Sequence, residues 1–216
     1  MKILVMSCDK NNDLWMPFYY CMEKYWPDHP EIIYSTETLT NQYYKTILKN
    51  YDVSQWTCRL YETLKEIDDN LILIMVDDIF IKGINLDKWN QLLNNLPDNF
   101  ASINFESSYD KDDSNYSSIL KKRSSKGRWK ISAMCSLWNK EILIKLLDNV
   151  VLNPWKFETD IDPLNYEYYI LKELILDWGH YKLGDMWGVY RGKWTSQALE
   201  FFKSENLTIN SERLNL

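Results

Sequence analysis

Histidine and cysteine are scarce in this chain of 216 residues, and their spacing excludes several kinds of site. The two histidines, His29 and His180, are too few and too isolated to suggest a multi-histidine metal centre or a histidine-based catalytic triad. The four cysteines occur singly and never as a CxxC pair, at Cys8, Cys21, Cys58 and Cys135. This pattern argues against a zinc site and a disulfide framework, so we expect reduced thiols and oxygen ligands for any metal.

Long apolar runs and the common phosphate-binding motifs are also missing. The most apolar stretch, residues 71–76, is far shorter than the roughly 20 residues that cross a bilayer. The N-terminus passes directly into a strand-like run at 3–6 and then into polar sequence, which predicts no signal peptide. Neither GxGxxG nor GxxxxGK[ST] occurs, so a phosphate-bearing ligand must be held in another way. We expect a cytoplasmic protein without a transmembrane segment.

Charge and aromatic content indicate which partners to expect. A net charge of −6 disfavours broad nucleic-acid binding, and we expect no nucleic-acid partner. A local basic stretch at 121–130 is compatible with a solvated loop or with peripheral contact to an anionic membrane surface. The chain contains 10 Trp and 15 Tyr. Such rings fill cores, but they also stack on sugars and bases.

Apolar periodicity predicts strands that alternate with helices in a single α/β domain. We expect strands at 3–6, 31–35, 71–76, 100–105 and 128–134. We expect helices up to residue 26 and at 54–67, 86–96, 137–147 and 166–176. Helices between strands act as crossover connections, which predicts a mostly parallel sheet flanked by helices. The polar segment 106–127 is predicted to be a mobile loop.

Two adjacent carboxylates, Asp77 and Asp78, follow the apolar run at 71–76. A run without alternation fits a strand buried on both faces, and ligands of open α/β sheets bind beyond the carboxyl ends of the strands. Mg²⁺ and Mn²⁺ are bound by one or two carboxylates together with substrate phosphates and water. The pair therefore predicts a metal-assisted phosphate site, unless helix N-termini or arginines satisfy both acids.

Basic side chains elsewhere are candidate partners for a diphosphate. Arg59 lies on the helix before the acid pair, and Arg191 and Lys193 lie near the C-terminus. Arginine binds phosphate through its bidentate fork and lysine as a point charge. The alternative for each is an ordinary surface residue.

Glu158 is a candidate general base because it is flanked by Trp155 and Phe157. Partial desolvation by such rings raises the pKa of a carboxylate towards neutrality. The rings also suit an acceptor sugar. The same segment equally fits a short helix start with two core anchors and an acid near the helix N-terminus.

Three segments resemble small bacterial and viral nucleotide-sugar glycosyltransferases of the GT-A fold, of the type that builds capsule or lipopolysaccharide glycans. The segments are Met6-Ser7-Cys8-Asp9-Lys10 with Leu14-Trp15-Met16-Pro17-Phe18, Trp56-x-x-Arg59-Leu60 leading to Val76-Asp77-Asp78, and Ser136-Leu137-Trp138-Asn139 followed by Pro154-Trp155-Lys156-Phe157-Glu158. The resemblance implies one Rossmann-like domain over 1–216. Its residues 1–105 would bind the nucleotide sugar, and residues 128–216 would bind the acceptor and carry the catalytic base.

The resemblance also implies roles for individual residues. Those expected to bind the donor nucleotide are Ser7, Cys8, Asp9, Arg59, Asp77, Arg191 and Lys193. Asp78, with Asp77 beside it, would hold Mn²⁺ or Mg²⁺ on the diphosphate. Glu158 would be the base, and Trp155 and Trp138 would contact a glycan or lipid-linked acceptor. The donor implied is a UDP-sugar.

One position departs from the family pattern, and three other functions stay open. The usual Asp-x-Asp motif has Val76 in its first position here, so we expect weak metal binding without substrate. A nucleotidyltransferase would use a similar sheet, although residues 7–12 contain neither Gly nor Arg. A non-catalytic carbohydrate-binding module would use the aromatic surplus without metal, and a glycosidase would use two carboxylates without nucleotide.

Overall fold

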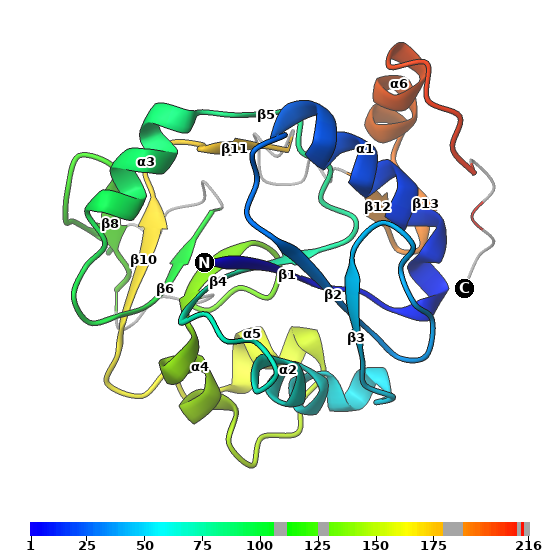
Figure 1. The fold of residues 1–216 in the computed structure, drawn as a ribbon. Helices are drawn as coiled ribbons and strands as arrows, with labels where there is room; N and C mark the ends of the chain where they lie inside the picture. The colour runs from blue at the N-terminus through cyan, green and yellow to red at the C-terminus, as the bar shows by residue number, and fades with distance from the viewer. Residues whose placement is uncertain (106–111, 125–129, 179–187, 211–212, 214–216) are drawn as a thin grey trace.

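A large β-sheet forms the centre of the protein, which a computed structural model describes at residues 1–105, 112–124, 130–178, 188–210 and 213 (Figure 1). Among these residues the sheet has nine strands: β1 Lys2–Met6, β2 Ile32–Thr36, β3 Lys45–Leu48, β4 Leu71–Val76, β6 Phe100–Asn104, β7 Ser114–Asn115, β8 Leu120–Lys122, β9 Ser136–Asn139 and β10 Glu167–Leu171. Their spatial order is β3-β2-β1-β4-β9-β6-β10-β8-β7. Two short ladders pair β5 Gly83–Ile84 with β11 Leu176–Asp177 and β12 Val189–Tyr190 with β13 Lys193–Trp194.

Most strands of the sheet run in one direction. β1 pairs in parallel with β2 and β4, β2 with β3, and β6 with β10. β9 lies between β4 and β6 and is antiparallel to both, so β4 and β6 also share a direction. β8 is antiparallel to β10. The predicted α/β fold with a mostly parallel sheet is therefore confirmed.

Helices cover both faces of this sheet (Figure 1). The helices of one face are α1 Trp15–Tyr25, α3 Leu86–Asn94 and α6 Ser196–Ser204, and those of the other are α2 Trp56–Leu64, α4 Lys140–Leu147 and α5 Pro154–Asp160. Short 3-10 helices, η1 Asp9–Leu14 and η2 Val53–Gln55, precede α1 and α2. Among the residues described, no helix is long and apolar enough to span a bilayer.

Strand β4 is buried on both faces, as its continuous apolar run predicts. Leu73 and Met75 belong to the core on the side of α1, whereas Ile72 and Ile74 belong to the core on the side of α2. Successive side chains of a strand point to opposite faces, so an apolar residue is needed at every position. The acid pair therefore follows a strand that is enclosed by both helical layers.

The structure corrects several sequence predictions. No strand forms in the described part of 128–134; instead β9 begins at Ser136, and α4 begins only after Asn139, whose side chain accepts a hydrogen bond from Ile142 N. The expected helix at 166–176 is strand β10, because its aromatic and branched side chains pack in the sheet between β6 and β8. The predicted loop 106–127 contains β7 and β8 within its described part. Strand β3 and helix α6 were not predicted.

Candidate active site

The acid pair lies where β4 ends, beside the end of β1. Asp77 is 2% exposed, and both of its carboxylate oxygens accept hydrogen bonds. Ser7 Oγ donates to Oδ2 at 2.5 Å, and Asn11 Nδ2 donates to Oδ1 at 3.1 Å. Trp15 Nε1 in turn donates to Ser7 Oγ at 2.8 Å, which orients the hydroxyl. The structure thus brings together Ser7 and Asp77, two of the residues expected to bind the donor.

Burial changes the acidity of both carboxyls. It raises the pKa of Asp77 and of Asp78, and the negative charge of Asp78 raises the pKa of Asp77 further. The hydrogen bonds from Ser7 and Asn11 act in the opposite direction on Asp77. Asp77 is buried and Asp78 is half-buried, and two neighbouring carboxyls in such surroundings are costly to ionise together.

The donor set suits a hard cation only if the substrate contributes ligands. Among the residues described, no three His, Cys, Asp or Glu side chains converge on one point. Asp77 accepts hydrogen bonds from Ser7 and Asn11, so Asp78 is the carboxylate of the pair that could bind a cation. One carboxylate completed by phosphate oxygens and water matches the way Mg²⁺ is bound at phosphate-transferring sites.

A second polar cluster lies beyond the ends of β1 and β2. Arg59 is 4% exposed, and its Nη1 lies 2.5 Å from Glu37 Oε1. Glu37 Oε2 accepts from Asp9 N at 2.6 Å, and the Asp9 carboxylate accepts from Thr38 N and Leu39 N. Arg59, predicted as a diphosphate partner, is therefore ion-paired with Glu37. The sequence reasoning missed Glu37, although it directly follows a buried strand, which is the signal that identified Asp77.

Cys8 lies between these two clusters. Burial, together with the negative charges of Asp77 and Glu37, raises the pKa of its thiol to about 11. The thiol is therefore neutral near pH 7. A pocket of about 300 Å³ adjoins this loop, and it is lined by Asn12, Trp15, Met16, Leu39, Thr40, Gln42 and Tyr43.

The hairpin β12–β13 is anchored at the acid pair by Gly188. This glycine has φ of +92°, and a Cβ built on it would lie 2.0 Å from the carbonyl oxygen of Asp78. Arg191 and Lys193 are exposed on the hairpin, and the Arg191 guanidinium lies 5.2 Å from the ring centre of Tyr190. The structure thus brings the base of the hairpin to Asp78, and it places Arg191 over Tyr190.

Glu158 lies on α5 and contacts the segment that leads into β9. Its Oε1 accepts a hydrogen bond of 2.7 Å from Ala133 N. Three residues later, Ser136 pairs with Ile74 of β4 and with Asn104 of β6. Because β9 runs against its neighbours, it starts near the edge where β4 ends. Glu158 is therefore held near the same edge of the sheet as the acid pair.

The two tryptophans expected at the acceptor have opposite environments. Trp138 is fully buried and packs against Phe157 and Tyr168, with ring centres 6.2 and 6.4 Å away. Its prediction as an acceptor contact is wrong, because its ring fills the core beneath α5. Trp155 is 68% exposed on α5, where an acceptor sugar can reach it.

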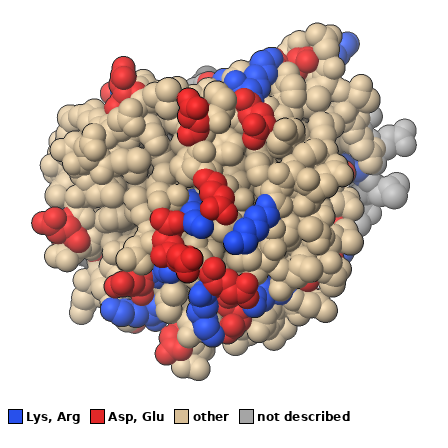
Figure 2. Space-filling model, in the orientation of Figure 1, with Lys and Arg blue, Asp and Glu red and all other residues tan. Residues whose placement is uncertain are grey.

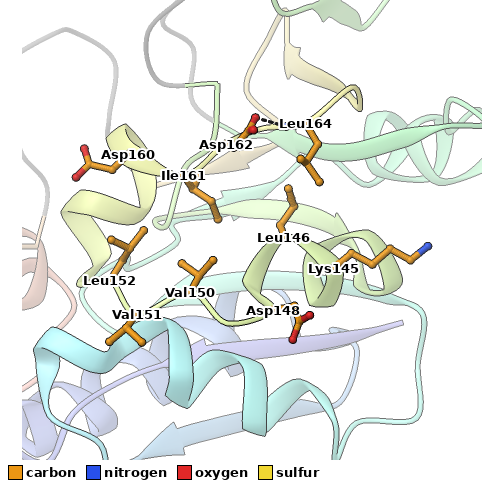
Figure 3. Close-up of a pocket in the computed structure, with 10 residues that line it drawn as sticks. All are labelled: Lys145, Leu146, Asp148, Val150, Val151, Leu152, Asp160, Ile161, Asp162 and Leu164. Carbon is orange, nitrogen blue, oxygen red and sulfur yellow. Dashed lines mark hydrogen bonds between the residues drawn. The ribbon is translucent and has the colours of Figure 1, made fainter.

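A pocket of about 320 Å³ lies beside α4 and the end of α5 (Figure 3). Figure 3 shows Leu146, Val150 and Ile161 facing its interior. The carboxylates of Asp148, Asp160 and Asp162 lie around it.

On the face shown in Figure 2, acidic and basic side chains are intermixed and form no continuous basic area among the residues described.

The fold is similar to that of a solved structure of S. aureus TarS. No protein-family model matches the sequence, and no curated protein matches it. The crystal structure of S. aureus TarS 1–349 in complex with UDP has a TM-score of 0.53 and 11% sequence identity, and covers 81% of this chain. The match spans 59% of that TarS chain. The chain therefore has a Rossmann-like α/β fold of the GT-A type.

Two other solved structures are similar at lower scores. The galactosyltransferase LgtC, in complex with donor and acceptor sugar analogues, has a TM-score of 0.45 and 13% identity, with 77% of this chain and 67% of LgtC covered. The 4-diphosphocytidyl-2C-methyl-D-erythritol synthase from Anaerococcus prevotii has a TM-score of 0.47 and 9% identity, with 95% of both chains covered.

Proposed function

We propose that this protein transfers a sugar from a nucleoside-diphosphate donor to a hydroxyl group of a glycan or lipid-linked acceptor. The observation that carries the proposal is the acid pair at the carboxyl end of β4 in a GT-A-like sheet, with Asp77 buried and Asp78 half-buried. Such an edge is where α/β proteins bind their ligands. The UDP bound to TarS, a protein of similar fold, supports UDP as the nucleotide.

Asp78 is the proposed protein ligand of Mn²⁺ or Mg²⁺, and Asp77 the proposed contact to a ribose or sugar hydroxyl. When bound, the cation neutralises charge on the departing diphosphate. Ser7 and Asn11 hold the Asp77 carboxylate in one orientation, which limits the reorganisation needed when the donor arrives. Because Asp78 acts with substrate oxygens, cation binding without nucleotide should be weak.

Glu158 is the proposed base, and Trp155 the proposed contact to the acceptor sugar. The Glu158 carboxylate is half-buried and fixed by the backbone of Ala133, so it is both oriented and reachable. As the acceptor hydroxyl attacks the anomeric carbon, Glu158 would take its proton while the bond to the diphosphate breaks. The exposed Trp155 ring offers a flat apolar face for the acceptor.

The test is thermal unfolding with UDP, CDP, CTP and uridine, each with and without Mn²⁺. A ligand that binds the native state raises the melting temperature by mass action. We expect UDP with Mn²⁺ to stabilise the wild-type chain and Asp78→Asn to abolish this shift. Asp68→Asn, which removes one exposed carboxylate before the opposite end of β4, is the matched control and should retain it.

Three outcomes would contradict the proposal. An equal shift in Asp78→Asn removes Asp78 from the metal site. Stabilisation by CTP but not by UDP would favour nucleotidyl transfer. No shift with any of the four ligands, with or without Mn²⁺, would favour a function without nucleotide, such as a carbohydrate-binding module.

A further inference from the structure

The C-terminal segment contacts the loop of the candidate active site through Arg213. The Nε atom of Arg213 lies 3.0 Å from Asp13 Oδ2, and Nη2 donates a hydrogen bond of 2.7 Å to Asn11 Oδ1. The Arg213 side chain is 5% exposed. Surface arginines usually keep the guanidinium in water, so a guanidinium this well covered is held by specific partners.

Asn11 connects Arg213 to the acid pair. An asparagine amide has one accepting oxygen and one donating nitrogen. Because the oxygen accepts from Arg213, the nitrogen is turned towards Asp77 and donates to it at 3.1 Å. If the amide were reversed, its oxygen would face the Asp77 carboxylate, and two acceptors would meet. Arg213 therefore favours the amide orientation in which Asp77 is hydrogen-bonded.

The charge of Arg213 also acts on the whole acidic cluster. Burial raises the pKa of Asp13, Asp77 and Asp78, and the positive charge of Arg213 opposes that rise at all three carboxyls. Arg59, the other buried arginine near this loop, is paired with Glu37 and not with these three acids. A guanidinium presents several donors in a fixed plane and can contact Asp13 and Asn11 at once, which a lysine ammonium does less well.

We propose that Arg213 is a positioning residue of the donor site, which orients Asn11 and thereby Asp77, so that the C-terminal segment is a working part of this site. The inference rests on the proposed function. It assigns Arg213 no contact with the substrate, and it predicts that Arg213 and Asn11 act as one unit.

The test is a double-mutant cycle on UDP affinity in the presence of Mn²⁺, measured by calorimetry on the full chain. We expect Arg213→Ala and Asn11→Ala each to weaken binding about tenfold. The double variant should bind UDP as tightly as the single variant of lower affinity. The reason is that each change alone already removes the contact of Arg213 with Asn11. Arg213→Lys should bind at least about threefold more weakly than the wild type, since a point charge does not hold both partners. Lys203→Ala on α6, which also removes one exposed positive charge, should bind as the wild type does.

The outcomes separate this inference from the proposed function. If Arg213→Ala binds UDP as the wild type does, or if the effects of the two single changes add, the inference is wrong and the proposed function stands. If Arg213→Ala fails to fold, Arg213→Lys decides, and wild-type affinity in that variant overturns the inference. If the wild-type chain binds no UDP, both fail.

Discussion

Asp77 and Glu158 lie near the same edge of the sheet, but their surroundings differ. Asp77 is 2% exposed, and side chains from two other segments fix both of its oxygens. Glu158 is half-buried, its carboxylate is tied to the backbone of a segment before β9, and the neighbouring Trp155 is exposed. Under the proposed function, the donor side is thus formed before any ligand arrives, whereas the acceptor side is open. Changes on the two sides should therefore affect different measurements.

The largest expected effect is on turnover, from Glu158→Gln. The amide keeps an oxygen that can accept from Ala133 N, so the fold should persist while the base is lost. We expect turnover of the UDP-sugar to fall about 10²–10⁴-fold with UDP affinity unchanged. Asp160→Asn, a change of the same kind on the same helix, should leave turnover intact. Unchanged turnover in Glu158→Gln would remove the base assignment, and a loss of UDP affinity would break the proposed division of the two sides.

The next largest effect concerns the two tryptophans, one behind the acceptor side and one on it. Trp138→Ala should lower the free energy of unfolding by about 3–5 kcal/mol, because it opens a cavity between α5 and β10. Trp155→Ala should change it by less than about 0.5 kcal/mol, since the ring is exposed. Denaturant titration of both variants measures the difference. Equal losses would contradict the core role of Trp138.

The smallest of these effects compares two glycines of the hairpin β12–β13. Gly188→Ala should lower the free energy of unfolding by about 3 kcal/mol, because the new methyl group meets the Asp78 carbonyl and the backbone has positive φ. It should also weaken UDP binding. Gly192→Ala has φ of +76° but open space, so we expect a loss of about 1 kcal/mol and normal UDP affinity. Normal UDP affinity in Gly188→Ala would show that the hairpin is not part of the donor side.

Strands β1, β2, β4 and β6 were predictable because each carries a clear apolar pattern, whereas β3 was missed. Residues 71–76 are apolar at every position, as a strand buried on both faces requires. The end of this strand then predicted that Asp77 and Asp78 lie at the ligand-binding edge of the sheet. The run at 166–176 is different. Its aromatic and aliphatic residues suit a buried helix as well as a strand. It forms a strand because it pairs between β6 and β8, and this pairing is not encoded in the local sequence.

The candidate site was predictable only where its residues adjoin a strand end. Trp138 was misplaced because a tryptophan surplus does not tell which ring is buried. Arg213 has no local signal at all, since it is one basic residue in a polar segment and its partner Asn11 is 202 positions away in the sequence. Contacts of this kind follow from the closed fold and not from any pattern within it.

The antiparallel strand β9 is preceded by a segment that can vary independently of strands β1, β2 and β4. β9 lies between β4 and β6, and the segment before it contacts Glu158 through Ala133. This segment is therefore separate in sequence from β1, β2 and β4. If the proposed function holds, substitutions in residues 130–135 and in α5 should alter acceptor selection and leave the strands at the proposed nucleotide site unchanged. Variation among proteins of this architecture should accumulate in that segment, and grafting it between two of them is a direct route to a new acceptor preference.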